Sequence, residues 1–178
     1  MIGFIHADDW LADDGVLNKV AKALADDSID GVYGDLRYVD ARDPHVIRRH
    51  WRAGEYDVSK LRFGWMPPHP TVYLRRSCYE QFGAFNLSMK TAADYELLVR
   101  MLVKHQIKMK YIPHVMVKMR SGGASNASLR NRLNANRDDR LAWSMNGLTP
   151  PFALRFTKPV RKLGQYFIRK PRFTGVES

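Results

Sequence analysis

Residues 1–9 read MIGFIHADD, an apolar run that stops at two adjacent aspartates. A short apolar run bounded in this way is typical of a buried strand, with Asp8 and Asp9 at its carboxyl end. Asp13 and Asp14 are then good N-caps for a helix, because apolar residues recur after them at i, i+3, i+4 and i+7. The predicted apolar face of this helix consists of Leu17, Val20, Ala21 and Leu24.

The segments that follow continue this alternation of a strand with a helix. Residues 31–39 (GVYGDLRYV) predict a strand, and residues 46–51 predict its hairpin partner across a turn-rich connection. Residues 64–70 (GWMPPHP) contain three prolines, which fix φ and remove backbone donors, so they predict a rigid loop. This loop leads into a strand at residues 71–74.

Two short helices are predicted next. Ser77 and Glu80 have the spacing of a capping box and open a helix that Gly83 closes. Thr91 and Asp94 have the same spacing and open a second helix with one apolar side. That side consists of Tyr95, Leu98, Met101 and Leu102.

The last predicted elements are two strands and a helix. Residues 107–112 and 115–119 read as strands separated by Pro113, and residues 128–146 read as a polar helix. Strands and helices therefore alternate through most of the chain. This pattern indicates the α/β class.

Length and composition limit the kind of protein. A chain of 178 residues with 45% apolar and 26% charged residues suits one globular domain. The single cysteine, Cys78, excludes a disulfide scaffold or a zinc cluster and favours a reduced, cytoplasmic protein. No apolar run approaches the roughly 18 residues of a membrane span. The net charge of +11 favours a polyanionic partner.

Pro150 and Pro151 divide the chain into predicted units. We expect a domain at residues 1–125, a polar helix covering it at 126–150, and a basic amphipathic tail at 151–178. The tail suits an anionic membrane surface, docking on the domain, or non-specific nucleic-acid binding. Its predicted membrane-binding residues are Arg155, Lys158, Arg161, Lys162, Arg169 and Lys170.

Asp8 and Asp9 are the sharpest candidates for chemistry. Open α/β sheets bind ligands beyond the carboxyl ends of their strands, and adjacent carboxylates there suit Mg²⁺ or Mn²⁺ bound to a diphosphate. The alternative is a solvated turn, since Asp-Asp pairs also occur at 13–14 and 26–27.

Three further positions have both a functional and a structural interpretation. Asp94 at a helix start serves as a helix-capping carboxylate, or as a general base if it faces the cleft of the aspartate pair. His69, between two prolines, contacts a substrate or fills the core. Arg120, with Gly122 and Gly123 close behind it, suits an anion-binding loop.

Taken together and in order, six short segments of residues 1–125 resemble the later half of a family 2 inverting glycosyltransferase with the GT-A fold. The segments are IGFIHADDW (2–10), YGD (33–35), HPTVYLRRS (69–77), FGAFN (82–86), AADYEL (92–97) and RSGGAS (120–125). The resemblance implies a partial GT-A, Rossmann-like sheet with flanking helices.

The resemblance also implies roles for residues. Asp8 and Asp9 take the place of the DXD-like metal motif for Mg²⁺ or Mn²⁺, and Asp94 takes the place of the catalytic base. The implied partners are a nucleotide-sugar donor and a glycan or lipid-linked acceptor in bacterial surface polysaccharide synthesis, with no sequence-specific nucleic acid. The implied substrate-binding residues are Tyr33, Asp35, His69, Arg120, Gly122 and Gly123.

Members of that family carry a nucleotide-binding half before the metal motif, and this sequence starts inside the strand that leads to Asp8. We therefore expect a truncated transferase that binds nucleotide sugar poorly, is marginally stable or self-associates, and lies at the cytoplasmic face of the membrane. The alternative is a non-catalytic basic domain that binds anionic membrane or nucleic acid. Convergence of Asp8, Asp9 and Asp94 on one cleft distinguishes the two hypotheses.

Overall fold

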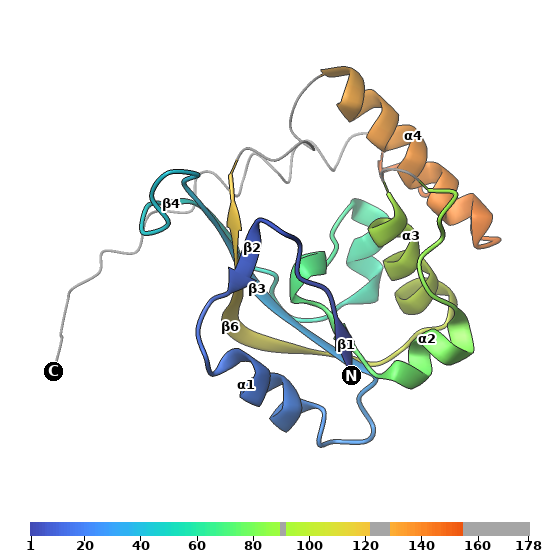
Figure 1. Ribbon diagram of the computed structural model, residues 1–178. Coiled ribbons are helices and arrows are strands. Elements are labelled where there is room, and N and C mark those ends of the chain that lie inside the picture. The colour runs from blue at the N-terminus through green and yellow to red at the C-terminus, as the bar shows by residue number, and fades with distance from the viewer. Residues whose placement is uncertain (90–91, 122–128, 155–178) are drawn as a thin grey trace, which may run out of the picture.

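The computed structural model describes residues 1–89, 92–121 and 129–154, and it shows a mixed α/β fold around an open, curled sheet (Figure 1). The strand order is β1-β5-β3-β6-β2, and β4 pairs with β3 beside this path. The strands are β1 (Ile2–Gly3), β2 (Asp9–Leu11), β3 (Gly31–Val39), β4 (Ile47–Trp51), β5 (Tyr73–Leu74) and β6 (Met109–Arg120). The central pair, β3 and β6, is parallel, and the other pairs are antiparallel. The predicted α/β class is confirmed.

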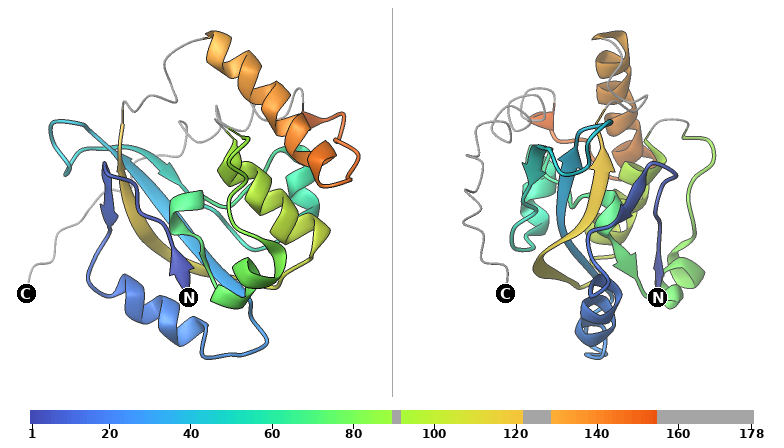
Figure 2. Two further views of the ribbon diagram at one scale, coloured as in Figure 1. Left: turned by 45° about the vertical axis from the view of Figure 1, so that its right-hand side comes forward. Right: turned by 60° about the vertical axis from the view of Figure 1, so that its left-hand side comes forward.

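Helices cover both faces of the sheet. The α-helices are α1 (Val16–Ala23), α2 (Arg76–Phe82), α3 (Ala93–Val99) and α4 (Leu129–Met145). A π-helical turn, η3 (Arg100–Lys104), continues α3, and the two 3-10 helices are η1 (Val58–Phe63) and η2 (His69–Thr71). The three views of Figures 1 and 2 agree that α1 and α4 lie at opposite ends of the molecule.

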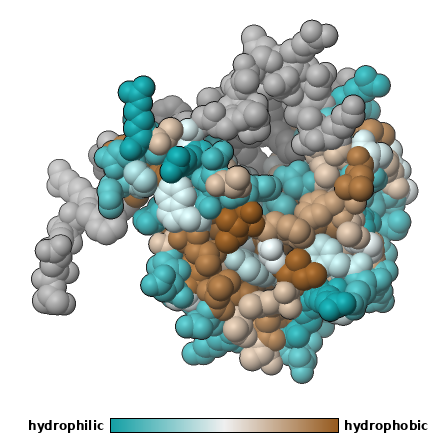
Figure 3. Space-filling model, viewed as in Figure 1, coloured by the Kyte–Doolittle hydropathy of each residue, from teal (hydrophilic) through white to brown (hydrophobic). Residues whose placement is uncertain are grey.

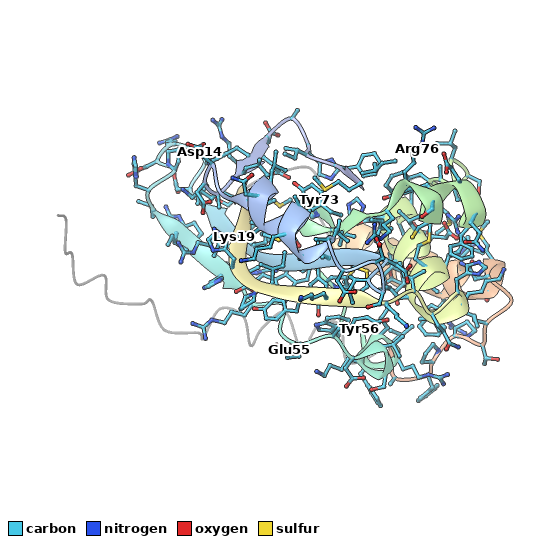
Figure 4. All side chains as sticks on the ribbon, turned by 90° about the horizontal axis from the view of Figure 1, so that it is seen from below. Asp14, Lys19, Glu55, Tyr56, Tyr73 and Arg76 are labelled. Atoms are coloured by element: carbon cyan, nitrogen blue, oxygen red, sulfur yellow. The ribbon has the colours of Figure 1, made fainter. Side chains whose placement is uncertain are left out.

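Alternate residues of β3 supply two separate cores, because successive side chains of a strand point to opposite faces. Val32 and Leu36 pack with Val16 and Val20 of α1. Tyr33 faces the other way, into a larger core with Trp65 and residues of α3 and α4. Figure 4 shows these two sides, with Lys19 of α1 on one side of the sheet and Tyr56 on the other.

The predicted strand at residues 1–7 is wrong in extent. Only Ile2 and Gly3 form a ladder, with Leu74 and Tyr73 of β5, and residues 4–8 are an exposed connection to β2. The ladder is short because β5 itself has two residues before α2 begins at Arg76. Asp8 therefore lies in a turn, and Asp9 opens β2 rather than closing β1.

Apolar surface remains exposed around this first segment. Met1, Phe4 and Ile5 are large apolar side chains with exposed fractions of 36% or more. Figure 3, which views the molecule as Figure 1 does, shows apolar atoms gathered on this face. No helix within the described ranges is long and apolar enough to cross a bilayer.

The helix at α1 is confirmed, but its predicted face is rotated. Leu17 and Ala21 are exposed, whereas Val16, Val20 and Leu24 are buried. The helical spacing of the apolar residues was predicted correctly, but the buried face was not. The helix starts at Val16, whose side chain packs against β3.

The predicted capping box of α2 is also wrong. The helix begins at Arg76, one residue before Ser77, and Glu80 pairs with the Arg76 side chain at 2.7 Å. Arg75 determines this start because its amide donates to the Asp30 carbonyl and its guanidinium donates to the carbonyls of Leu24 and Ile29. Gly83 ends the helix with φ of 90°, as predicted.

Pro113 does not separate two strands; it lies inside the single strand β6. The β3–β6 register passes from Gly34 opposite Ile112 to Asp35 opposite Val115, so Pro113 and His114 are unpaired in a bulge. Proline is tolerated at a bulge because no ladder hydrogen bond requires its missing N–H. The predicted β3–β4 hairpin is confirmed. The loop predicted at residues 64–70 is confirmed only as far as Pro68, because His69–Thr71 form η2, and the strand predicted at residues 71–74 is limited to β5 at Tyr73–Leu74.

Gly34 makes this bulge possible, and its replacement tests the packing. A Cβ at Gly34 would lie 2.5 Å from the Met116 sulfur and 2.8 Å from the His114 carbonyl oxygen. We expect Gly34→Ala to lower the free energy of unfolding, measured with urea, by about 1–3 kcal/mol, as overpacked cores do. Gly15→Ala is the matched control, because its Cβ would meet only the ends of the Lys19 and Asp13 side chains. Equal stability of the two variants would contradict this account of the bulge.

Candidate active site

Asp94 lies in the first turn of α3, and a buried ion pair fixes that helix. The Glu96 carboxylate is 3% exposed and accepts from Nε and Nη2 of Arg100, both at 3.0 Å. Arg100 also donates to the carbonyls of Phe82, Gly83 and Ala84, and Asn146 donates to Glu96 Oε1 at 2.9 Å. These bonds join the end of α2, the start of α3 and the end of α4. The Asp94 carboxylate is partly buried, and its Oδ1 accepts from the Tyr95 amide at 2.8 Å.

His69 lies in the η2 turn, within electrostatic reach of Asp94, and Thr71 holds that turn against β3. The Thr71 hydroxyl lies 2.8 Å from the Pro68 carbonyl and 3.0 Å from the Gly34 carbonyl, and it accepts from the Gly34 amide at 3.2 Å. The hydroxyl is fully buried, so it satisfies groups that water cannot reach. The proline-rich loop thus presents His69 at a fixed position.

The His69 ring sits in an aromatic cluster and is 7% exposed. It stacks on Phe4, with ring centroids 6.3 Å apart, and meets the edge of Phe85 at 5.6 Å. Its Nδ1 is buried without a hydrogen-bond partner among the described residues. Burial lowers the pKa of His69, the charge of Asp94 opposes this effect, and His6 adds to it. The imidazole is therefore neutral at neutral pH.

Asp8 ends the connection between β1 and β2, Asp9 begins β2, and both lie close to His6 in the chain. The Asp9 amide donates to the His6 carbonyl at 3.0 Å. Asp8 is exposed, whereas Asp9 is partly buried and its Oδ2 accepts no hydrogen bond from the described part of the chain. Burial raises the pKa of Asp9; His6 opposes that rise and Asp8 adds to it.

This pair of carboxylates fits a divalent cation that is shared with a ligand. An unpartnered carboxylate oxygen beside a second carboxylate is the hard, anionic donor set that Mg²⁺ or Mn²⁺ takes. Within the described ranges, no three His, Cys, Asp or Glu side chains are grouped so as to hold a metal by themselves. The other ligands of such an ion would thus be oxygens of a bound substrate or water.

The predicted residues are brought together through two histidines. Asp94 acts electrostatically on His69, and His6 acts on both His69 and Asp9. The rings of His6 and His69 lie 6.2 Å apart. The segment that carries Asp8 and Asp9 and the loop near Asp94 therefore approach each other through these two histidine rings.

Arg120 lies beside this neighbourhood at the end of β6. Asp9 of β2 is opposite Met119, so strand pairing places Arg120 next to Asp9, with its guanidinium 5.8 Å from the centre of the Trp10 ring. The candidate loop residues Gly122 and Gly123 lie outside the described residues. The same holds for the candidate membrane-binding residues of the tail, which are Arg155, Lys158, Arg161, Lys162, Arg169 and Lys170.

Two expected substrate-binding residues lie elsewhere. Tyr33 is fully buried, and its hydroxyl donates to the Gly54 carbonyl at 2.8 Å, so its place in the structure is a packing position rather than a substrate contact. Asp35 is 7% exposed and lines a separate cavity with His50 and Tyr111. Tyr33 and Asp35 lie on the same face of β3, two residues apart, and Tyr33 packs there into the core that also contains residues of α3.

Sequence reasoning missed His6, Phe4 and Phe85. His6 stands two residues before Asp8, and this spacing across a turn was a usable signal. The two phenylalanines come from distant segments, and their contact with His69 depends on tertiary packing that no local pattern shows.

Comparisons with known proteins point in the same direction. No family model matches the chain. A PGL/p-HBAD biosynthesis glycosyltransferase of Mycobacterium tuberculosis is 29% identical over 128 residues, which cover 69% of this chain and 46% of that protein. The protein of the same name from Mycobacterium bovis matches equally. The chain thus spans about half the length of these relatives, and it is distantly homologous to a glycosyltransferase.

The buried state of His69 predicts a dependence of stability on pH. Burial lowers the pKa of His69 in the folded chain, whereas an unfolded histidine titrates at about 6.5. Below that pH the unfolded state binds more protons, so the contribution of His69 to stability is present at neutral pH and is lost as the pH falls.

We expect His69→Gln to reduce the slope of the free energy of unfolding, measured with urea, between neutral and mildly acidic pH. The exposed His45 provides the control variant His45→Gln, which should keep the wild-type slope. An unchanged slope in His69→Gln would show that His69 titrates alike in both states.

Proposed function

We propose that this chain forms the catalytic, acceptor-side part of a metal-dependent glycosyltransferase that inverts the configuration of a nucleotide-activated sugar. The observation that carries the proposal is the 6.2 Å approach of the His6 and His69 rings, which places the segment of Asp9, with its unpartnered carboxylate oxygen, beside the loop whose histidine is within electrostatic reach of Asp94. The distant homology to a glycosyltransferase supports it. The contact between the His6 and His69 rings favours a transferase over a purely basic binding domain.

In the proposed reaction, Asp94 acts as the general base. Its carboxylate, held by the Tyr95 amide on one oxygen, takes the proton of an acceptor hydroxyl. The oxygen of the acceptor hydroxyl attacks the anomeric carbon of the donor sugar. The bond from this carbon to the nucleoside diphosphate breaks on the opposite face, and the nucleoside diphosphate leaves. A divalent cation bound by Asp8 and Asp9 would supply charge neutralisation for the departing diphosphate.

His69 positions groups in this reaction and carries no charge. A neutral imidazole can donate to one oxygen and accept from another, so it suits the hydroxyl that approaches Asp94. Its aromatic neighbours Phe4 and Phe85 pack on the imidazole and help to exclude water from it. Exclusion of water strengthens the electrostatic interactions on which a base and a metal depend.

The acceptor in this proposal is a glycan or lipid-linked molecule of the bacterial cell surface. The relatives are named for PGL/p-HBAD biosynthesis, and the candidate tail residues beyond Leu154 are basic. A basic tail would attract the chain to anionic lipid, at about 1 kcal/mol for each Lys or Arg near the surface. We propose the cytoplasmic face of the membrane as the place of the reaction.

Asp94→Asn tests the proposed base. With Mn²⁺ and a bacterial lipid extract as the source of acceptor, we expect the wild-type chain to release nucleoside diphosphate from one of a panel of UDP-, GDP- and dTDP-sugars. The variant should reduce that rate by about 10²- to 10⁴-fold, the contribution of a general base. Asp27→Asn, at a side chain that is 96% exposed, is the control. Full activity of Asp94→Asn, or no release from any donor, would argue against the proposal.

A second test addresses the metal. Mn²⁺ added with UDP or GDP should broaden the amide signals of residues 6–9 in NMR spectra, because a bound paramagnetic ion relaxes nearby nuclei. Asp9→Asn should abolish this broadening. The double variant of Asp26 and Asp27 to Asn is the matched control, since it removes another adjacent pair that already contacts Ser28 and Arg75. If the broadening is lost in the Asp26 and Asp27 double variant and kept in Asp9→Asn, the assigned site is wrong.

A further inference from the structure

A polar cavity of about 560 Å³ opens on the sheet. Its walls come from β3, β4, β6 and the segment after β2, and its lining contains none of Asp8, Asp9, His69 and Asp94. Five basic side chains line it: Arg37, His50, Arg52, His114 and Lys118. The cavity has the size of an ordinary small-molecule site.

The two carboxylates in the lining are already matched by protein groups. Asp13 Oδ2 lies 2.7 Å from His114 Nε2, and this hydrogen bond lowers the pKa of Asp13. Asp35 accepts from the Ala53 amide at 2.9 Å and from the Tyr111 hydroxyl at 2.8 Å, and His50 Nε2 lies 3.4 Å away. Burial alone would raise the pKa of Asp35, but the contacts with His50, Ala53 and Tyr111 hold it below its ordinary value.

Three cations remain without a matching carboxylate. In the described part of the chain, Arg37, Arg52 and Lys118 form no ion pair within 4.0 Å. The Arg37 Nε is moreover buried with no hydrogen-bond partner in those residues. A buried guanidinium N–H without an acceptor is costly, and an anionic ligand would satisfy it.

The strand register concentrates this charge. Arg37 on β3 lies directly opposite His50 on β4 and directly opposite Lys118 on β6. Like charges at opposed positions destabilise a sheet, so a row of three basic residues across three strands is unfavourable by itself. The row does not serve the packing of the sheet, and a bound anion would convert the repulsion into attraction.

We infer that this cavity is an oxyanion site that takes a phosphate or diphosphate ester. Three convergent cations match a ligand that carries more than one negative charge, and guanidinium forks suit phosphate oxygens. The cavity volume leaves room for an organic group beyond the phosphate. The ester is supplied either by a soluble molecule or by the headgroup of a lipid. The inference does not depend on the proposed transfer reaction.

Titration with inorganic pyrophosphate, without divalent metal, tests the site. We expect saturable binding by calorimetry, with NMR shifts at Arg37, His50 and Lys118. The double variant Arg37→Met and Lys118→Met should weaken binding at least about 10-fold, the effect of losing about 1.4 kcal/mol of interaction. The control Lys22→Met and Lys104→Met removes the same charge from α1 and η3, and it should bind as the wild type does.

The stability of the double variant distinguishes a ligand-binding role of the basic row from a structural one. Removal of two members of a like-charge row should leave the urea midpoint of the double variant unchanged or higher. A lower midpoint together with unchanged pyrophosphate binding would overturn the inference, because the basic row would then support the fold. Absence of saturable binding to the wild-type chain would overturn it as well.

Vesicles distinguish the two sources of phosphate. If a lipid supplies the phosphate, vesicles of phosphatidylcholine with phosphatidylglycerol should co-sediment with the wild-type chain and with the Lys22 and Lys104 control. They should co-sediment less with the Arg37 and Lys118 variant, and pyrophosphate should compete with the vesicles. If a soluble ester supplies it, the wild type and both variants should sediment alike while pyrophosphate binding still separates them. Asp94 is intact in all of these proteins, so the outcome is independent of the proposed catalysis.

Discussion

The buried ion pair of Glu96 and Arg100 is the interaction on which the candidate active site depends. It fixes the start of α3, and with it Asp94, against the end of α2 and the end of α4. Removal of either partner would leave an uncompensated buried charge, which typically destabilises a protein by about 3–5 kcal/mol. An aspartate on a loop would lose its position with each local fluctuation. The ion pair instead gives Asp94 the rigidity of three helices.

Local sequence patterns predicted the elements whose signals are local. The β3–β4 hairpin, the proline-rich loop and the helix behind Asp94 were all recognisable, because alternation, prolines and helical spacing are properties of short segments. The errors arose where a distant partner decides the outcome. The length of β1 is limited by β5, and Arg75 moves the start of α2 by binding carbonyls almost fifty residues earlier in the chain.

The candidate site shows the same division. Asp8, Asp9, His69 and Asp94 stood out by residue type and position, whereas the aromatic cluster and His6 emerged only from tertiary contacts. The basic row could not have been found in the sequence at all. Arg37, His50 and Lys118 are neighbours only through the register of three strands, and the irregularities of β6 between Ile112 and Val117 shift that register by three residues. Without the bulge, other side chains of β6 would face Arg37.

Strand β2 connects the two charged regions. Asp9 begins this strand at the candidate active site, and Asp13, just beyond the end of the strand, lines the basic cavity. The two aspartates are four residues apart, which is about 13 Å in an extended chain. Among the described strands, β2 pairs with β6 alone, and β6 also carries Lys118 and Arg120. A displacement of β2 along β6 would therefore move Asp9 and the cavity wall together.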